Sequence, residues 1–299
     1  VPKVNNLDMT SKGWEIQVNW RDQIRDFKYG VTLSLSDNQV VIDRYPNPSN
    51  TILDKDNNNT YYAGAHVGDI WGFQTVGIAK TDQEMKDHLA SMPNGAQDVL
   101  GSGWGAGDVM YADLNGDGIY GSSYDYDFQG ASAMPKFGYG INISASWKNF
   151  DLSMLWAGNG GFKLYWEEDP YNSVAIRNGF AVSERVANDH YFYDPENPGD
   201  SRTNLSGYIP RLVENSKQSR QTSNYYLYNG TYMKLKNLTL GYTLPSTLTD
   251  KVSAERVRVY LSGENLFTIT SFPGQDPEMG ASTNYPSLRQ FAAGISVTF

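Results

Sequence analysis

The feature that most constrains the fold is an alternation of apolar and polar residues with a period of two. In GWEIQVNW (residues 13–20) the even-numbered residues are apolar, and Glu, Gln and Asn lie between them. Successive side chains of a β-strand point to opposite faces, so such a stretch predicts a strand with one apolar face. The pattern returns in FKYGVTLSLS (27–36), PKFGYGINISASWK (135–148), FDLSMLWAG (150–158), TYMKLKNLTLGYTLP (231–245), VRVYLSGENLFTIT (257–270) and FAAGISVTF (291–299).

One of these stretches changes phase. Its apolar residues pass from Met233 and Leu235 to Leu238 and Leu240, so the alternation slips by one position near Lys236. An extra residue in one strand of a pair is a β-bulge. We expect a bulge at this position.

Short and long connections alternate between the predicted strands. The short ones lie at about 21–26, 148–149 and 245–255, and the long ones at about 39–134, 167–224 and 271–290. Outer-membrane barrels have tight periplasmic turns and long extracellular loops. This order of short and long connections therefore indicates an all-β, antiparallel transmembrane β-barrel. It also predicts that the chain ends with Phe299 at the periplasmic side.

About seven strands do not close a barrel, because bacterial membrane barrels have an even number of strands. An open sheet would leave edge N–H and C=O groups in hydrocarbon, at a cost of several kcal/mol each. We therefore expect residues 1–299 to be part of a longer barrel. A soluble secreted β-sandwich or propeller is the alternative. It explains the alternation of apolar and polar residues equally well, but it gives no reason for the alternation of short and long connections.

Composition excludes several classes of function. The net charge of −9, without a clustered basic stretch, argues against nucleic acid as a partner, and the lack of cysteine excludes thiol catalysis. Acidic pairs such as Glu167–Glu168 have no spacing that fixes a glycosidase geometry, so we do not expect an enzyme. The sequence begins at Val1 without a signal peptide, which predicts a processed chain or a piece of a longer one.

The stretch DLNGDGIYGSSYD (residues 113–125) predicts a calcium loop. Asp113, Asn115 and Asp117 take the first, third and fifth positions of an EF-hand-type loop. Gly118 supplies the sharp turn, and Ile119 offers its carbonyl oxygen. These are the hard oxygen ligands that Ca²⁺ prefers.

The loop departs from the pattern at its twelfth position, where Tyr124 replaces the bidentate Glu. Asp125 or Asp127 is the candidate substitute, and Asp125 is taken into the predicted ligand set. The alternative is a turn rich in Asx and Gly that caps only its own backbone.

Aromatic residues of the long connections are the candidates for substrate binding, because flat rings stack on sugar rings. The predicted contacts are Trp104, Tyr111, Tyr124 and Tyr126, and further aromatic residues in these connections are Tyr120, Trp166, Tyr171, Tyr191 and Tyr193. The alternative for each is an anchor that packs its own loop or a ring at the membrane boundary.

Seven stretches, in order, resemble the SusC/RagA-like TonB-dependent outer-membrane transporters of Bacteroidetes. They are SKGWEIQVNWRD, GDVMYADLNGDG, PKFGYGINISASWKNFDLSMLWAG, YMKLKNLTLGYTLP, VRVYLSGENLFTIT, DPEMG and YPSLRQFAAGISVTF. They run almost to both ends of the chain. DPEMG (276–280) is characteristic of the family, and we expect it to be a structural turn.

The resemblance implies that the chain holds the last seven or so strands of a barrel of about 22 strands. It places the protein in the outer membrane of a Gram-negative bacterium, with the plug domain and TonB box outside this chain. It implies TonB-dependent import of oligosaccharides, with peptides as the alternative substrate. The implied partners are a SusD-like surface lipoprotein, TonB, the remaining strands and plug, and lipid. A soluble secreted module that binds carbohydrate with calcium is the alternative from another class.

Overall fold

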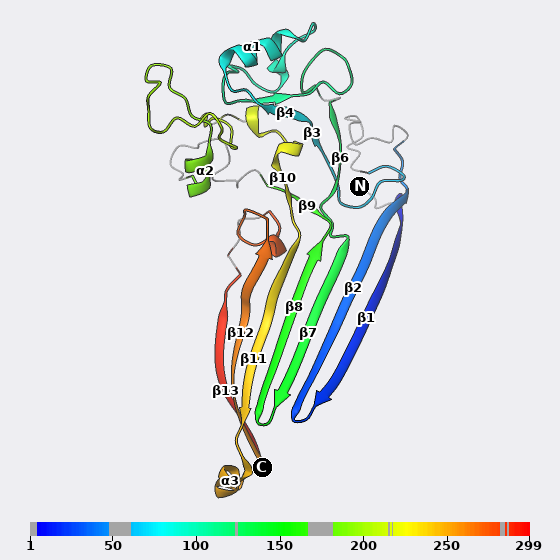
Figure 1. The fold of residues 1–299 in the computed structure, drawn as a ribbon. Helices are drawn as coiled ribbons and strands as arrows, with labels where there is room; N and C mark the ends of the chain where they lie inside the picture. The colour runs from blue at the N-terminus through cyan, green and yellow to red at the C-terminus, as the bar shows by residue number, and fades with distance from the viewer. Residues whose placement is uncertain are drawn as a thin grey trace.

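The computed structural model describes residues 5–47, 61–122, 125–166, 182–214, 216, 218–281, 285 and 287–299. Its main feature is a seven-stranded antiparallel sheet with the order β1-β2-β7-β8-β11-β12-β13 (Figure 1). These strands are the seven stretches that the alternation predicts. They are β1 (Asp8–Ile24), β2 (Phe27–Arg44), β7 (Phe137–Trp147), β8 (Phe150–Gly160), β11 (Tyr232–Thr243), β12 (Arg256–Thr270) and β13 (Gln290–Thr298).

Smaller elements lie beyond both ends of this sheet. The large group beyond one end contains three two-stranded sheets, β3-β6, β4-β5 and β9-β10, and the opposite end carries α3 (Figure 1). The remaining strands are β3 (Asp69–Phe73), β4 (Thr75–Ile78), β5 (Val109–Tyr111), β6 (Tyr126–Ser132), β9 (Lys163–Tyr165) and β10 (Leu227–Asn229). The helices are α1 (Asp82–Ala90), α2 (Glu184–Asp189) and α3 (Ser246–Thr249), with 3-10 turns η1 (Gln97–Val99), η2 (Gln218–Arg220), η3 (Asn224–Tyr226), η4 (Asp250–Val252) and η5 (Pro277–Met279).

Among the residues described, no helix has the length and apolar character needed to cross a membrane.

The strand register joins the apolar residues of the sheet into one continuous face. Leu261 of β12, for example, lies between Leu240 and Ala293 of the neighbouring strands and is 63% exposed. Within the described chain nothing covers this face. One row of directly paired apolar residues crosses six strands, through Val18, Leu33, Ile141, Trp156, Leu235 and Phe267.

The opposite face is polar and carries an ion pair that crosses a strand. Arg258 Nε and Nη2 donate to the two carboxylate oxygens of Asp151, at 2.9 and 2.6 Å. Gly241 lies beneath this pair, and a Cβ there would come within 2.5 Å of the Asp151 carboxylate. Glycine therefore allows charged side chains to lie flat along the polar face.

The bulge that the sequence predicts is confirmed. The register of β11 shifts between Leu235 and Asn237 against both neighbouring strands. Lys236 is the extra residue against β8, whereas against β12 the two residues Asn265 and Leu266 lie opposite Lys236. The first short connection is tighter than predicted, because β1 and β2 pair as far as Ile24 and Phe27 and only two residues form the turn.

The motif DPEMG ties the last long connection to the wall at this bulge. Asp276 caps η5 by accepting from Glu278 N at 3.0 Å. Lys234 Nζ of β11, whose side chain is 2% exposed, binds Asp276 Oδ2 at 2.6 Å and Glu278 Oε2 at 2.9 Å. Lys236 binds the other Glu278 oxygen. Burial raises the pKa of Asp276, but hydrogen bonds, that from Lys234 foremost, outweigh it and hold the pKa below its ordinary value.

The apolar face gives a first prediction for the full-length protein. Leu261→Arg places a cation near the middle of β12 on this face, which at the bilayer midplane costs about 2–4 kcal/mol. We expect less folded barrel in the membrane, measured by heat-modifiable gel migration. Ser262→Arg, on the polar face, is the matched control. Equal folding of the two variants would contradict a lipid-facing surface.

The DPEMG anchor gives a second prediction. Lys234→Met leaves two carboxylates without their buried cation, and breaking a buried pair from one side costs about 3–5 kcal/mol. We expect faster hydrogen exchange of residues 272–281 in the intact transporter. Lys236→Met removes a more exposed pair and should have an effect of about 1 kcal/mol or less. Unchanged hydrogen exchange of this loop in Lys234→Met would show that Lys234 does not hold DPEMG to the wall.

Candidate functional site

The first two long connections fold together beyond the end of the sheet. Their shared core contains Phe73, Val109 and Tyr111 from the first connection and Tyr191 from the second. Tyr191 also donates its hydroxyl hydrogen to Lys80 O at 2.8 Å. The two connections therefore form one body with its own apolar core.

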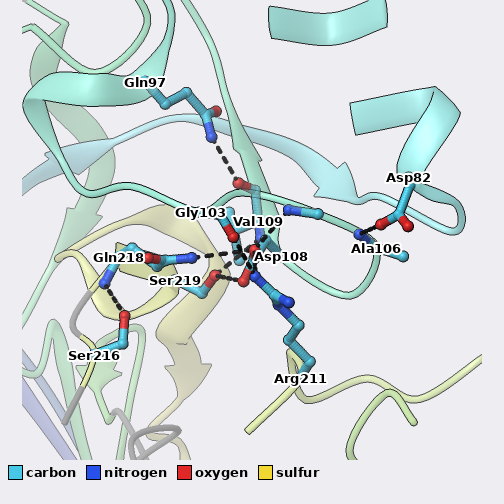
Figure 2. Close-up of polar contacts among 11 residues, drawn as sticks. Asp82, Gln97, Gly103, Ala106, Asp108, Val109, Arg211, Ser216, Gln218 and Ser219 are labelled. Carbon is cyan, nitrogen blue, oxygen red and sulfur yellow. Dashed lines mark hydrogen bonds and ion pairs between the residues drawn. The ribbon is translucent and has the colours of Figure 1, made fainter. Parts of the chain in front are cut away.

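Asp108 is the polar centre of this body (Figure 2). Its carboxylate is fully buried, and Oδ2 accepts from Arg211 Nη2 at 2.6 Å, Gln218 Nε2 at 3.1 Å and Gly105 N at 3.0 Å. Oδ1 accepts from Ser219 Oγ at 3.0 Å. A buried carboxylate is stable when it is paired and hydrogen-bonded, as here. Because three of these donors come from the second connection, the pairing fixes the two loops to each other.

A second layer of hydrogen bonds supports Asp108. Ser219 Oγ accepts from Val109 N at 3.1 Å, and Tyr111 donates its hydroxyl hydrogen to Gln218 O at 2.7 Å. The buried Gln97 side chain donates to Val109 O at 3.1 Å and accepts from Tyr111 N. Side chains thus satisfy backbone groups that the short strand β5 leaves open.

The structure corrects one predicted substrate contact. Tyr111 has no exposed surface, and its ring packs against Phe73 and Trp104, so it is a core anchor and cannot stack on a ligand. A local pattern could not show this, because the residues that cover Tyr111 come from both connections. Burial raises the pKa of the Tyr111 hydroxyl far above its ordinary value.

The other predicted aromatic contacts are more accessible. Trp104 and Tyr126 are half-buried, and Tyr126 packs edge-on against Phe73 with ring centroids 5.2 Å apart. Their binding role stays a prediction. Tyr124 lies outside the described residues.

A cavity of about 550 Å³ lies beside the Asp108 network. Its lining includes the aromatic side chains of Tyr191, Phe192 and Tyr193, the carboxylate of Asp82 and the guanidinium of Arg211. The sequence predicts Tyr191 and Tyr193 as candidate aromatic contacts. It does not predict that they lie beside residues of the first connection. The lining residues are Asp82, Ala106, His190, Tyr191, Phe192, Tyr193, Pro195, Arg211 and Leu212.

Three of the predicted calcium ligands come together. Asp113, Asp117 and Asp125 each offer a carboxylate oxygen within 4.8 Å of the others. Asn115 donates from Nδ2 to Asp117 Oδ2 at 3.0 Å, and Ile119 N donates to Asp117 Oδ1 at 2.9 Å. Binding of an ion to this cluster stays a prediction.

The Asp108 network gives a third prediction. Asp108→Asn removes the charge that Arg211 pairs with, and hydrogen bonds to charged groups are worth about 1.5–3 kcal/mol each. We expect faster proteolysis of the two outer connections in the full-length protein, with the barrel wall intact. Asp98→Asn, an exposed carboxylate of η1, is the control. Identical cleavage of the two variants would show that Asp108 does not hold the loops together.

Comparison with known proteins covers almost the whole chain. No family model matches the sequence. The chain is 26% identical to TonB-dependent receptor P3 of Formosa agariphila over 99% of this chain, and 28% identical to receptor P26 of the same organism over 97%. TonB-dependent receptor SusC of Bacteroides thetaiotaomicron is 26% identical over 64% of the chain. The chain spans 29% of the length of P3 and of P26.

Solved structures agree in fold. A structure described as the RagAB peptide transporter matches 98% of this chain and 29% of its own with a TM-score of 0.70 and 21% identity. RagAB in a closed-closed state, described as a peptide importer, matches with a TM-score of 0.68 and 22% identity. These matches show that the chain shares the fold of the corresponding part of RagAB. The chain therefore resembles, in sequence and in fold, the barrel portion of SusC/RagA-like TonB-dependent transporters, which confirms the resemblance that its motifs predict.

Proposed function

We propose that this chain forms barrel wall and outer loops of a transporter that imports oligosaccharides across the outer membrane of a Gram-negative bacterium. The observation that carries the proposal is the uncovered apolar face that crosses the seven-stranded sheet. A soluble carbohydrate-binding module would have to bury that face. Lipid is the environment in which it is stable.

The proposed transport path runs along the other face of the sheet. Its charged side chains lie flat against the strands, as the Arg258–Asp151 pair does, and leave a polar surface toward the interior of a barrel. Capture would take place between the outer loops and a SusD-like lipoprotein. Energy coupling through TonB would depend on parts of the transporter that precede this segment.

The substrate class is proposed from the cavity beside Asp108. Phe192 and Tyr193 contribute aromatic rings to the lining, and His190 and Arg211 contribute polar groups to the same cavity. Aromatic faces with a few convergent polar groups suit a sugar chain. Peptide is the second candidate, because the carboxylate of Asp82 in this lining has the charge that pairs with the amino end of a peptide.

Uptake by cells that carry the full-length transporter and its lipoprotein tests this function. We expect TonB-dependent uptake of labelled oligosaccharides, and Tyr193→Ala should reduce it by about two- to twelvefold because a ring contact is worth about 0.5–1.5 kcal/mol. Tyr193→Phe keeps the ring and should retain uptake. Uptake of peptides but not of sugars would show that peptide is the substrate. Uptake in cells that lack TonB would contradict the proposal of a TonB-dependent transporter.

A further inference from the structure

The loop after β5 folds around the carboxylate of Asp113. Asp113 Oδ1 accepts from Gly116 N at 2.7 Å, and Oδ2 accepts from Gly118 N at 3.0 Å. Both glycines have positive φ, 75° and 80°, which other residues adopt only with strain. The chain therefore bends so that Asp117, between them, points its side chain back toward Asp113.

Asp125 closes the loop from its far end. Its carboxylate is fully buried and accepts from Leu114 N at 2.7 Å and from Ser122 N at 2.9 Å. Burial raises the pKa of Asp125 above its ordinary value, and the nearby Asp113 charge adds to this. In the described part of the chain no lysine or arginine pairs with Asp113, Asp117 or Asp125. Three carboxylates thus converge without a cation from the protein.

Ser122 provides an independent observation. The residue is 9% exposed, and its Oγ is buried with no hydrogen-bond partner of proper geometry. The backbone N–H of Ser122 donates to Asp125 Oδ2 at 2.9 Å, so the residue lies against the cluster of carboxylates. A buried hydroxyl without a partner is unfavourable. An ion between the carboxylates would give its oxygen a partner.

We propose that Asp113, Asn115, Asp117 and Asp125, with the Ser122 hydroxyl beside them, bind one Ca²⁺ ion. Calcium takes six to eight oxygen ligands in a flexible geometry, whereas magnesium demands a near-ideal octahedron and keeps several waters. A loop that supplies several carboxylate and amide oxygens fits calcium better.

The geometry also selects the residue that replaces the missing twelfth ligand. Asp125 belongs to the cluster. Asp127 is exposed, and its Oδ1 accepts a hydrogen bond from the neighbouring backbone N–H of Phe128 at 2.7 Å.

The ion would fix the outer end of the loop body. Asn94 Nδ2 donates to Asp117 O at 2.6 Å, and Asn94 N donates to Gly118 O at 3.3 Å. Gly95 and Ile119 form a parallel β-bridge. This segment leads directly into Gln97, which supports the Asp108 network. Calcium would therefore stabilise the loop between β5 and β6 and, through it, the junction of the two long connections.

Calorimetric titration of the metal-free, full-length transporter with CaCl₂ tests the proposal. We expect a site with a Kd of about 10⁻⁴–10⁻³ M or tighter, the range of extracellular calcium modules. Asp117→Asn should weaken binding at least about tenfold, because calcium affinity depends on the number of charged ligands. Ser122→Ala should weaken it less, and Asp127→Asn, the matched control, should bind as the unmodified protein does.

Hydrogen exchange of residues 109–122 supplies a readout that does not depend on transport. We expect slower exchange in CaCl₂ than in MgCl₂, and no such difference in Asp117→Asn, while exchange of the barrel strands stays the same. The proposal is overturned if Asp117→Asn and Ser122→Ala both bind calcium as the unmodified protein does. Failure of oligosaccharide uptake would leave this result unaffected.

Discussion

Backbone hydrogen bonding between antiparallel strands is the constraint on which the rest of this structure depends. Each interior strand of the sheet is paired on both sides, whereas β1 and β13 are each paired on one side within the described chain. In hydrocarbon an unpaired N–H or C=O costs several kcal/mol, so these edges need further strands. In the proposed membrane setting the sheet would therefore be stable as a section of a closed barrel.

The wall and the outer loops solve different packing problems. In the proposed barrel the wall would have lipid on one side and a polar interior on the other, so its side chains would match two environments and not a common core. The loops would lie in water, and they bury their own apolar groups, as the cluster around Tyr111 does. Because connections this long cannot be held by short strands alone, buried polar groups such as Asp108 and Lys234 fix them to one another and to the wall.

The sequence predicts the wall well, because a strand with two different environments leaves a local signal. The seven strands and the bulge at Lys236 follow from alternation alone. The loops leave no such signal. Asp108 and Arg211 are 103 residues apart, and no pattern near either residue identifies the other. Tyr111 shows the same limit, since the residues that pack against its ring, Phe73 and Trp104, are not its neighbours in sequence.

The calcium loop and DPEMG lie between these extremes. The spacing of Asp113, Asn115 and Asp117 identifies a candidate ligand set, but only the folded loop separates Asp125 from Asp127. DPEMG is expected to be a turn, and η5 is one, yet its two carboxylates also bind lysines of β11. A local motif thus predicts its own backbone better than it predicts its distant partners.

The central claim is that the apolar face touches lipid, and spin-label accessibility along β12 tests it most directly. Single cysteines at positions 258 to 262 of the full-length transporter, on a cysteine-free background, would carry the label in bilayers. The account predicts that labels at 259 and 261 are accessible to oxygen dissolved in lipid, and that labels at 258, 260 and 262 are accessible to a water-soluble relaxing agent. Labels at 259 and 261 that neither reagent reaches would mean that this face is packed against protein, and would contradict the account.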